Sequence, residues 1–184
     1  MKRTLAILAV VLLACPFAAC GGGGGGEADP VESYVPTSGE VSGWTEDTAA
    51  ANNGAAGAEV CREAVGIPDF IDGAIDPFVD TGAWVAVAWE FYTNGTNTLE
   101  LRLYEMGNAS ACQEVYDYLA THPEGVAWQA ASLGDAGRTA DQGPYWKTHA
   151  RKGNYFVETF TFPGDEPTQQ IAVDFVGAVL AGLP

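Results

Sequence analysis

The chain has 184 residues with 24 acidic and eight basic side chains, which gives a formal net charge of −16. This surplus of negative charge repels nucleic-acid phosphates and anionic lipid headgroups, so neither is expected as a partner. Hydrophobic residues make up 47% of the chain, enough for one domain with a core of ordinary size.

The first twenty residues have the three parts of a secretory signal. Lys2 and Arg3 come first, an apolar run covers residues 5–13, and small residues lead to Cys20. As a helix this run would measure about 15 Å, roughly half of a hydrocarbon core. We therefore expect a removable signal peptide at 1–19. Its removal leaves six basic and 24 acidic residues, a net charge of −18.

Residues 17–20, Phe-Ala-Ala-Cys, resemble the lipobox of bacterial lipoproteins, in which the cysteine thiol is acylated. The resemblance implies that Cys20 is lipidated, although Phe17 stands where the family usually has leucine. Leu-Leu-Ala-Cys at 12–15 offers Cys15 as an alternative, but Pro16 follows at once and the apolar run would be very short. A second alternative is an ordinary secretory signal that releases a soluble product.

A glycine-rich tether follows the lipobox. Residues 21–26 are all glycine, and the chain then stays polar to residue 39, with Pro30 and Pro36. Glycine loses the most backbone entropy on ordering, so this segment should be flexible. We predict a lipid-anchored tether and leader at 20–39 and one globular domain at 40–184. Gly21 lacks the acidic signature that keeps some lipoproteins at the inner membrane, so the resemblance favours the outer membrane of the cell envelope.

Two cysteines remain after Cys15 leaves with the signal and Cys20 is lipidated. Cys61 and Cys112 are then the possible partners in an oxidising compartment, and the sequence predicts a disulfide between them. Closing a loop of about 52 residues would stabilise the fold by roughly 4 kcal/mol. The alternative is two buried free thiols.

Hydrophobic periodicity and capping residues predict the elements of the domain. In chain order these are a helix at 59–65, strands at 83–92 and 98–106, a helix from Asn108 or Ser110 to 121, strands at 145–151 and 154–162, and a helix that has Pro167 in its first turn and ends near Leu183. The apolar stripe of the last helix consists of Ile171, Phe175, Val179 and Leu183. This order predicts an α+β fold in which an antiparallel sheet, or two half-sheets, is built from β-hairpins with helices packed on one side.

Matching of apolar residues predicts the register of both hairpins. A three-residue loop at 93–95 would place Trp89 opposite Leu99, so that Glu90 and Glu100 share the other face. A three-residue loop at 151–153 would group Trp146, Ala150, Phe156 and Phe160 on one face and Lys147, His149 and Arg151 on the other.

The stripe of Lys147, His149 and Arg151 is a concentration of basic side chains in an acidic domain. If it faces outward with Tyr155 nearby, it combines cationic and aromatic groups that suit an acidic ligand or an envelope protein. The alternative is an ordinary solvated face whose cations offset nearby carboxylates. The stripe is our candidate partner face.

Three segments carry a resemblance to a family of bacterial secreted domains of unknown function. They are Ser-Gly-Glu-Val-Ser-Gly-Trp at 38–44, Phe-Ile-Asp-Gly-Ala at 70–74 with Pro-Phe-Val at 77–79, and Leu-Arg-Leu-Tyr-Glu-Met at 101–106. The resemblance covers most of residues 36–183. It implies a fold and brings no activity or catalytic residue.

Signatures of enzymes are missing from the sequence. It has no GxSxG elbow, HExxH pair, P-loop or dinucleotide fingerprint. Asp69, Asp72, Asp76 and Asp80 could gather around Ca²⁺, but the spacing of an EF-hand is absent and solvated positions explain them. We expect no cofactor, no metal and no catalytic residue.

The sequence thus favours a lipid-anchored envelope lipoprotein that acts as a non-catalytic binding or protein-interaction module. The alternatives are a structural envelope component and a carboxylate-dependent hydrolase that uses Glu90 and Glu100.

The lipobox gives a first prediction. Cys20→Ser should abolish incorporation of labelled palmitate and leave a precursor of unchanged size, because the thiol that takes the lipid is lost. Acylation that persists in this variant would contradict the assignment, and label found on Cys15 would identify the other cysteine.

Overall fold

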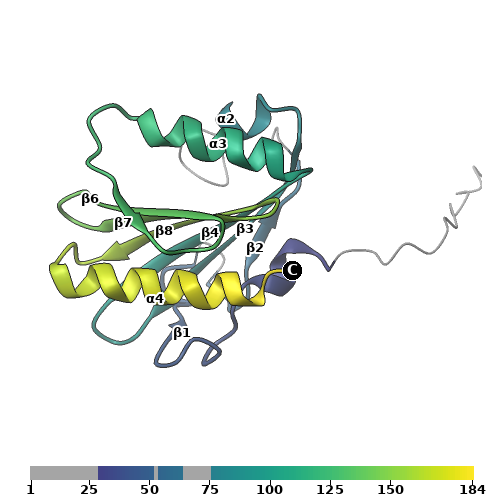
Figure 1. Ribbon diagram of the computed structural model, residues 1–184. Coiled ribbons are helices and arrows are strands. Elements are labelled where there is room, and N and C mark those ends of the chain that lie inside the picture. The colour runs from purple at the N-terminus through teal and green to yellow at the C-terminus, as the bar shows by residue number, and fades with distance from the viewer. Residues whose placement is uncertain (1–28, 52–53, 64–75) are drawn as a thin grey trace, which may run out of the picture.

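The computed structural model describes residues 29–51, 54–63 and 76–184, in which an antiparallel sheet lies between helices (Figure 1). The strands of these ranges are β1 (Thr45–Glu46), β2 (Glu59–Cys61), β3 (Trp84–Thr93), β4 (Thr98–Met106), β5 (Gln129–Ala131), β6 (Ala136–Asp141), β7 (Trp146–Lys152) and β8 (Tyr155–Phe162). The helices are the 3-10 helix η1 (Val31–Tyr34), α2 (Asp76–Val79), α3 (Ala109–Thr121) and α4 (Glu166–Gly182). The protein has the predicted α+β class with an antiparallel sheet.

The strand order is β1-β3-β4-β8-β7-β6-β5, and β2 also pairs with β3. The hairpins β3–β4 and β7–β8 agree with their predicted ranges to within one residue. Because β4 pairs with β8, the two hairpins form one sheet rather than two half-sheets. The remaining strands were not predicted, since three of them have two or three residues and β6 is rich in small and polar side chains.

The two long helices begin where capping residues predict. Asn108 is the N-cap of α3, and its side chain accepts a hydrogen bond from the Ala111 amide at 2.9 Å. Asp165 caps α4, which has Pro167 in its first turn and carries the predicted apolar stripe into the core. No helix in the described ranges is both long and apolar enough to cross a membrane.

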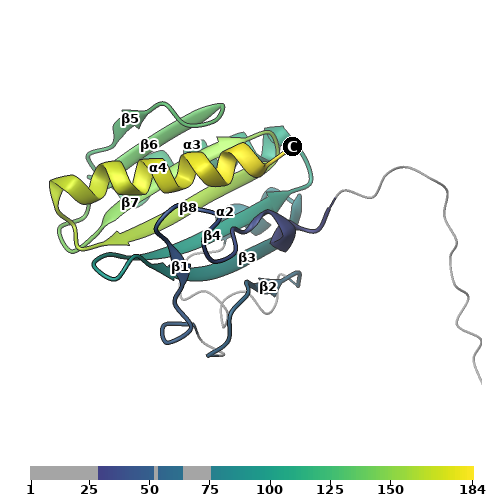
Figure 2. The same cartoon turned by 90° about the horizontal axis from the view of Figure 1, so that it is seen from below.

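The helices cover both faces of the sheet rather than one. Figures 1 and 2 show α4 on one face and α2 and α3 on the other. The face under α4 carries Leu99, Leu101 and Leu103, packed with Phe175 and its neighbours. The opposite face carries another apolar cluster that includes Phe78, Val87, Tyr104, Met106, Cys112, Val115 and Phe156. Since both faces present apolar side chains, each face needs a cover.

The register of the first hairpin differs from the prediction. Val87 pairs with Tyr104 and Trp89 pairs with Arg102, so the loop has four residues, 94–97. The Asn94 side chain closes this loop by accepting hydrogen bonds from the amides of Thr96 and Asn97 at 3.0 and 2.7 Å. Trp89 therefore shares a face with charged residues instead of with leucines.

The second hairpin also has a different register. Lys152 pairs with Tyr155, so the loop consists of Gly153 and Asn154, with Gly153 at φ 56°. Lys147, His149 and Arg151 still share a face, as the alternation of β7 predicts. Their cross-strand partners are Phe160, Glu158 and Phe156.

The folded domain begins before the predicted boundary at residue 40. Val31 and Val35 are buried in the core beneath α4, and the Tyr92 hydroxyl donates to the Pro36 carbonyl oxygen at 2.7 Å. The leader therefore belongs to the domain from η1 onward. The helix predicted at 59–65 is also corrected, because Glu59–Cys61 forms strand β2; residues 64–65 lie outside the described ranges.

The predicted disulfide is not formed in the structure, where Cys61 and Cys112 are both free thiols. Cys61 lies on β2 opposite Val87, and its Sγ donates to the Glu63 carbonyl oxygen at 3.3 Å. Cys112 lies on α3, near Arg151 of β7 and the buried Phe156 of β8. Strands β3, β4 and β8 separate β2 from β7, which explains why the two thiols do not meet.

The position of the leader gives a stability prediction. A variant that begins at residue 40 should be less stable than one that begins at residue 29 by about 3–6 kcal/mol, because two buried valines are lost. Urea denaturation of the two variants measures the difference. Equal midpoints would contradict the assignment of η1 to the domain.

Candidate functional site

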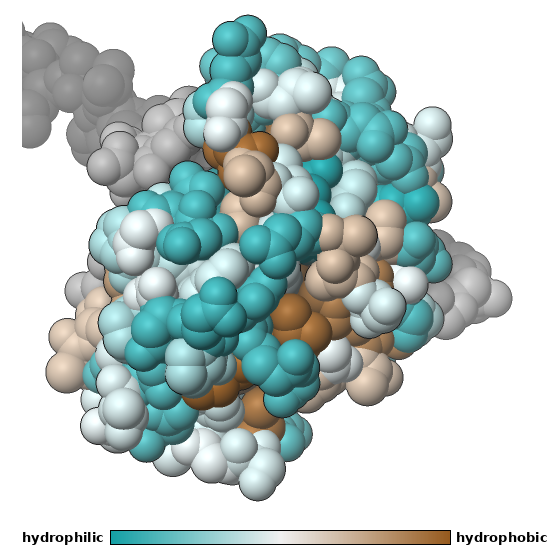
Figure 3. Space-filling view, turned by 60° about the vertical axis from the view of Figure 1, so that its left-hand side comes forward, coloured by the Kyte–Doolittle hydropathy of each residue, from teal (hydrophilic) through white to brown (hydrophobic). Residues whose placement is uncertain are grey.

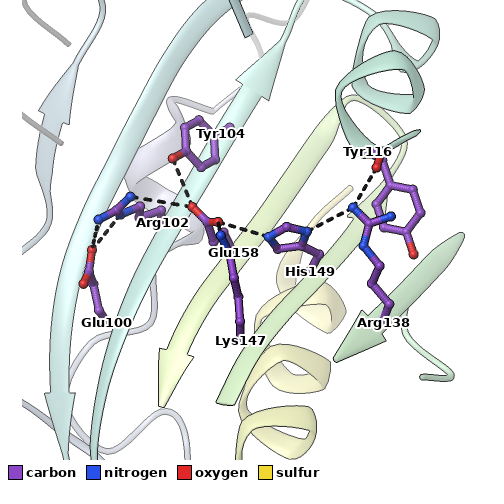
Figure 4. Close-up of polar contacts among 8 residues, drawn as sticks. All are labelled: Glu100, Arg102, Tyr104, Tyr116, Arg138, Lys147, His149 and Glu158. Carbon is purple, nitrogen blue, oxygen red and sulfur yellow. Dashed lines mark hydrogen bonds and ion pairs between the residues drawn. The ribbon is translucent and has the colours of Figure 1, made fainter. Parts of the chain in front are cut away.

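The candidate site is a row of paired side chains on the face of the sheet that α3 covers (Figure 4). Antiparallel pairing places residues of neighbouring strands directly opposite each other. The row contains, from β3 to β6, Trp89, Arg102, Glu158, His149 and Arg138. Glu100 and Lys147 belong to the next row of the same face, where Phe160 lies between them. We call Glu100, Arg102, Arg138, Lys147, His149 and Glu158 the charged row.

Glu158 is the centre of the charged row. Its Oε1 lies 3.0 Å from His149 Nε2 and 2.8 Å from Lys147 Nζ. Its Oε2 accepts a hydrogen bond from the Tyr104 hydroxyl at 3.4 Å and lies 3.7 Å from an Arg102 guanidinium nitrogen. Burial alone would raise the pKa of Glu158, but the His149 hydrogen bond and the charges of Lys147 and Arg102 lower it overall. Glu158 is therefore ionised at neutral pH.

His149 is a neutral imidazole between two charged groups. Arg138 donates to its Nδ1 at 3.1 Å, so the proton lies on Nε2, which donates to Glu158. His149 is 1% exposed, and burial lowers its pKa to about 4 despite the opposing effect of Glu158.

Aromatic rings flank the cations of the row. Arg102 binds Glu100 at 2.6 Å, and its guanidinium lies 4.8 Å from the Phe160 ring and 5.6 Å from the Trp89 ring. Lys147 lies 4.9 Å from the same Phe160 ring. These distances are those of cation–π contacts, which compensate partly desolvated charges.

Arg138 ends the row beneath α3. Its guanidinium lies 4.0 Å from the Tyr116 ring and 4.6 Å from the Trp128 ring, and it donates to the Tyr116 carbonyl oxygen at 2.7 Å. The Trp128 ring also lies 4.6 Å from the His149 ring. The inner end of the row is thus enclosed by aromatic side chains.

Partly exposed aromatic residues lie at the other end of this face. Trp89 contacts Phe91, and Tyr145 contacts both Phe160 and Phe162. We call these five residues the aromatic strip. Phe162 is 37% exposed, and the side chains of Lys147 and Arg102 are 20% and 13% exposed beside the strip. This end of the face combines rings and cations that solvent reaches.

The structure brings together some of the residues that the sequence selected. Lys147, His149 and Arg151 share one face, but His149 is buried and Tyr155 lies on the opposite face, packed in the core beneath α4. Arg151 pairs with Asp135 at 3.2 Å, away from Glu158. The predicted outward stripe is therefore an inward polar row with one partly exposed end.

Sequence reasoning missed the partners in the row, Arg102, Glu158 and Arg138. Alternation places each of them on one face of its strand, but the correct registers were needed to join the faces. The same correction separates Glu90 from Glu100. Glu90 pairs with Leu101 and Phe91 pairs with Glu100, so the two carboxyl groups lie on opposite faces of the sheet.

Two of the aspartates considered for calcium line a different hollow. Asp76 and Asp80 border a space of about 210 Å³ between α2 and α3, together with Glu114 and Tyr118. Asp69 and Asp72 lie outside the described residues. Within the described part of the chain, no group of three or more His, Cys, Asp or Glu side chains is placed to hold a metal ion.

Comparisons with known proteins do not name the fold or the site. No protein-family model matches the chain, and no similar protein was found among curated proteins or solved structures. The resemblances to bacterial lipoproteins and to a family of secreted domains stay predictions.

The neutral state of His149 predicts acid sensitivity. Its pKa of about 4 lies below the ordinary value of 6.5, so the unfolded chain binds more protons once the pH falls below about 6.5. Stability should fall by about 3 kcal/mol between pH 7 and pH 4 through this group. Below the ordinary pKa of glutamate, the lowered pKa of Glu158 acts in the same direction.

Urea denaturation across this range, compared with His149→Gln, measures the effect. Glutamine retains one donor and one acceptor but does not titrate, so the variant should lose stability less steeply between pH 6.5 and pH 4. Parallel pH profiles for the two proteins would contradict the neutral assignment.

Proposed function

We propose that the protein is a lipid-anchored lipoprotein of the bacterial cell envelope, whose domain is a non-catalytic module that binds an acidic partner. The envelope location and the lipid anchor are supported by the signal at 1–19, the lipobox cysteine Cys20 and the glycine tether. The charged row and the aromatic strip support the binding role. Outer-membrane attachment is part of the proposal, on the grounds of Gly21.

The observation that carries the binding role is the concentration of cations on one face. The described ranges contain six Lys and Arg residues, and four of them lie on this face: Arg102, Arg138, Lys147 and Arg151. The strands place three carboxylates on this face, Glu59, Glu100 and Glu158, and Asp135 pairs with Arg151, so the cations are concentrated here but not in excess. Arg102, Lys147 and Arg151 are partly exposed, and in an acidic protein they are the groups that an acidic partner would contact.

The aromatic strip supplies the apolar part of such an interface. Aromatic side chains and arginine are enriched where proteins bind each other. Figure 3 shows a largely polar surface with apolar side chains in small separate patches on the side that lies at the left of Figure 1. A small apolar patch beside cations, such as the aromatic strip, suits a small and partly polar protein interface.

The strip lies far from the point where the chain enters the domain. Tyr34 of η1 contacts Tyr155 at the start of β8, and Phe162 ends the same strand. Seven residue steps of a strand measure about 23 Å. A partner bound at the strip would therefore meet the domain on the side away from its anchor.

A hydrolase that uses Glu90 and Glu100 has lost its geometric basis, since the sheet lies between the two carboxyl groups. A structural role in the envelope is the remaining alternative, and it differs from the proposal in needing no specific partner at the strip.

Phe162→Ala tests the proposal. Phe162 is exposed, so truncation should change stability little while it weakens binding of a partner at the strip. Crosslinking in cells followed by mass spectrometry should recover the partner several-fold less with this variant, and less at high ionic strength.

Val85→Ala is the matched control, because Val85 is 39% exposed at the start of β3. It should leave recovery unchanged. Identical partner recovery from Phe162→Ala, Val85→Ala and the unchanged protein would eliminate the strip as the binding site.

A further inference from the structure

Glu90 is a second buried carboxyl group, on the face of the sheet opposite to Glu158. It is 2% exposed and lies in the middle of the hydrophobic strand β3. Glu46 of β1 pairs with Tyr92 on one side of it, and Glu59 of β2 pairs with Trp89 on the other. Glu90 therefore lies where two short edge strands meet the sheet.

Within the ranges that the structure describes, Glu90 has no cations or side-chain donors of the kind that stabilise the ionised form of Glu158. Its Oε1 accepts a hydrogen bond from the amide of the next residue, Phe91, at 2.9 Å, and its Oε2 is buried without a partner. Among the described residues, none of the ion pairs includes Glu90. An ionised carboxylate is strongly unfavourable in such a position unless it is paired.

The charged groups that act on Glu90 from β1 and β2 have the same sign as its own ionised form. Burial raises the pKa of Glu90, and the carboxylates of Glu46 and Glu59 raise it further, while the amides of Phe91 and Gly57 offset part of the increase. Tyr92, on the same face, has its pKa raised mainly by burial and stays neutral. Glu46 already accepts hydrogen bonds from Gly57 and Ser38 at 3.0 and 2.9 Å.

The strands that flank Glu90 are held weakly. β1 pairs with β3 through two residues and β2 through three. One further backbone bond, from the Asp47 amide to the Phe91 carbonyl oxygen at 2.8 Å, extends the contact of β1. Edge segments with so few bonds open at a lower free energy than the centre of a sheet.

We propose that Glu90 is held as the neutral acid and acts as a pH-sensitive latch, so that loss of its proton detaches β1 and β2 from the edge of β3. The sign follows from linkage: a group whose pKa is raised by folding stabilises the closed state at low pH, and this stabilisation is lost as the pH rises through the raised value. The latch closes in acid and opens in base, opposite to the effect of His149. It does not depend on the proposed binding function.

Hydrogen–deuterium exchange of the full chain tests the latch. Protection factors, corrected for the intrinsic exchange rate, are measured for peptides at 43–51 and 54–63 from about pH 5 to about pH 9. In the unchanged protein these peptides should lose protection about tenfold or more as the pH rises, whereas peptides from β7 and β8 keep theirs. Glu90→Gln should keep β1 and β2 protected throughout, because the amide cannot ionise.

Glu114→Gln, the same chemical change on the exposed face of α3, is the control and should behave like the unchanged protein. The latch is overturned if protection of β1 and β2 does not depend on pH, if Glu90→Gln loses protection as the unchanged protein does, or if β7 and β8 open in parallel.

Discussion

An ionised carboxylate in the middle of a sheet needs hydrogen-bond donors from the strands beside it, and Glu158 sets this requirement for the whole face beneath α3. Lys147 and His149 of β7 meet one oxygen, while Tyr104 and Arg102 of β4 meet the other. Each of these donors in turn needs partners that compensate its own burial. Arg102 is placed between Glu100 and aromatic rings, and His149 takes its second hydrogen bond from Arg138. The register of three strand pairs is therefore tied to one charge, because a shift of one residue would leave it unpaired.

The sheet holds its two buried glutamates in opposite protonation states. Glu158 has cations and a histidine around it, and Glu90 has a backbone amide and two carboxylates nearby. Burial raises the pKa of both side chains, but only Glu158 has partners that lower it overall, so Glu158 is an anion and Glu90, in our proposal, is a neutral acid. Acid consequently destabilises the charged row, whereas base destabilises the edge of the sheet at β1 and β2.

The two long hairpins and the two long helices could be predicted from the sequence, and the site could not. Alternation, the Asn108 cap and the stripe around Phe175 gave the long strands and helices because those signals are local. Registers were inferred by matching apolar residues, and this rule failed where Trp89 faces Arg102 and Phe160 faces Lys147. Cation–π contacts and paired charges make such a mixed face stable, and a hydrophobic pattern carries no information about them. The short edge strands were not predicted, because a strand of two or three residues shows no periodicity.

The burial of Val31 limits how far the domain can travel. If Cys20 carries the lipid, eleven residue steps separate it from the core, and a fully extended chain of that length spans about 40 Å at most. A boundary at residue 40 would have allowed almost twice this reach. A shorter tether keeps the domain within a thinner layer above the lipid surface. Within that layer the effective concentration of the domain toward a fixed target is higher, and targets beyond the layer are out of reach.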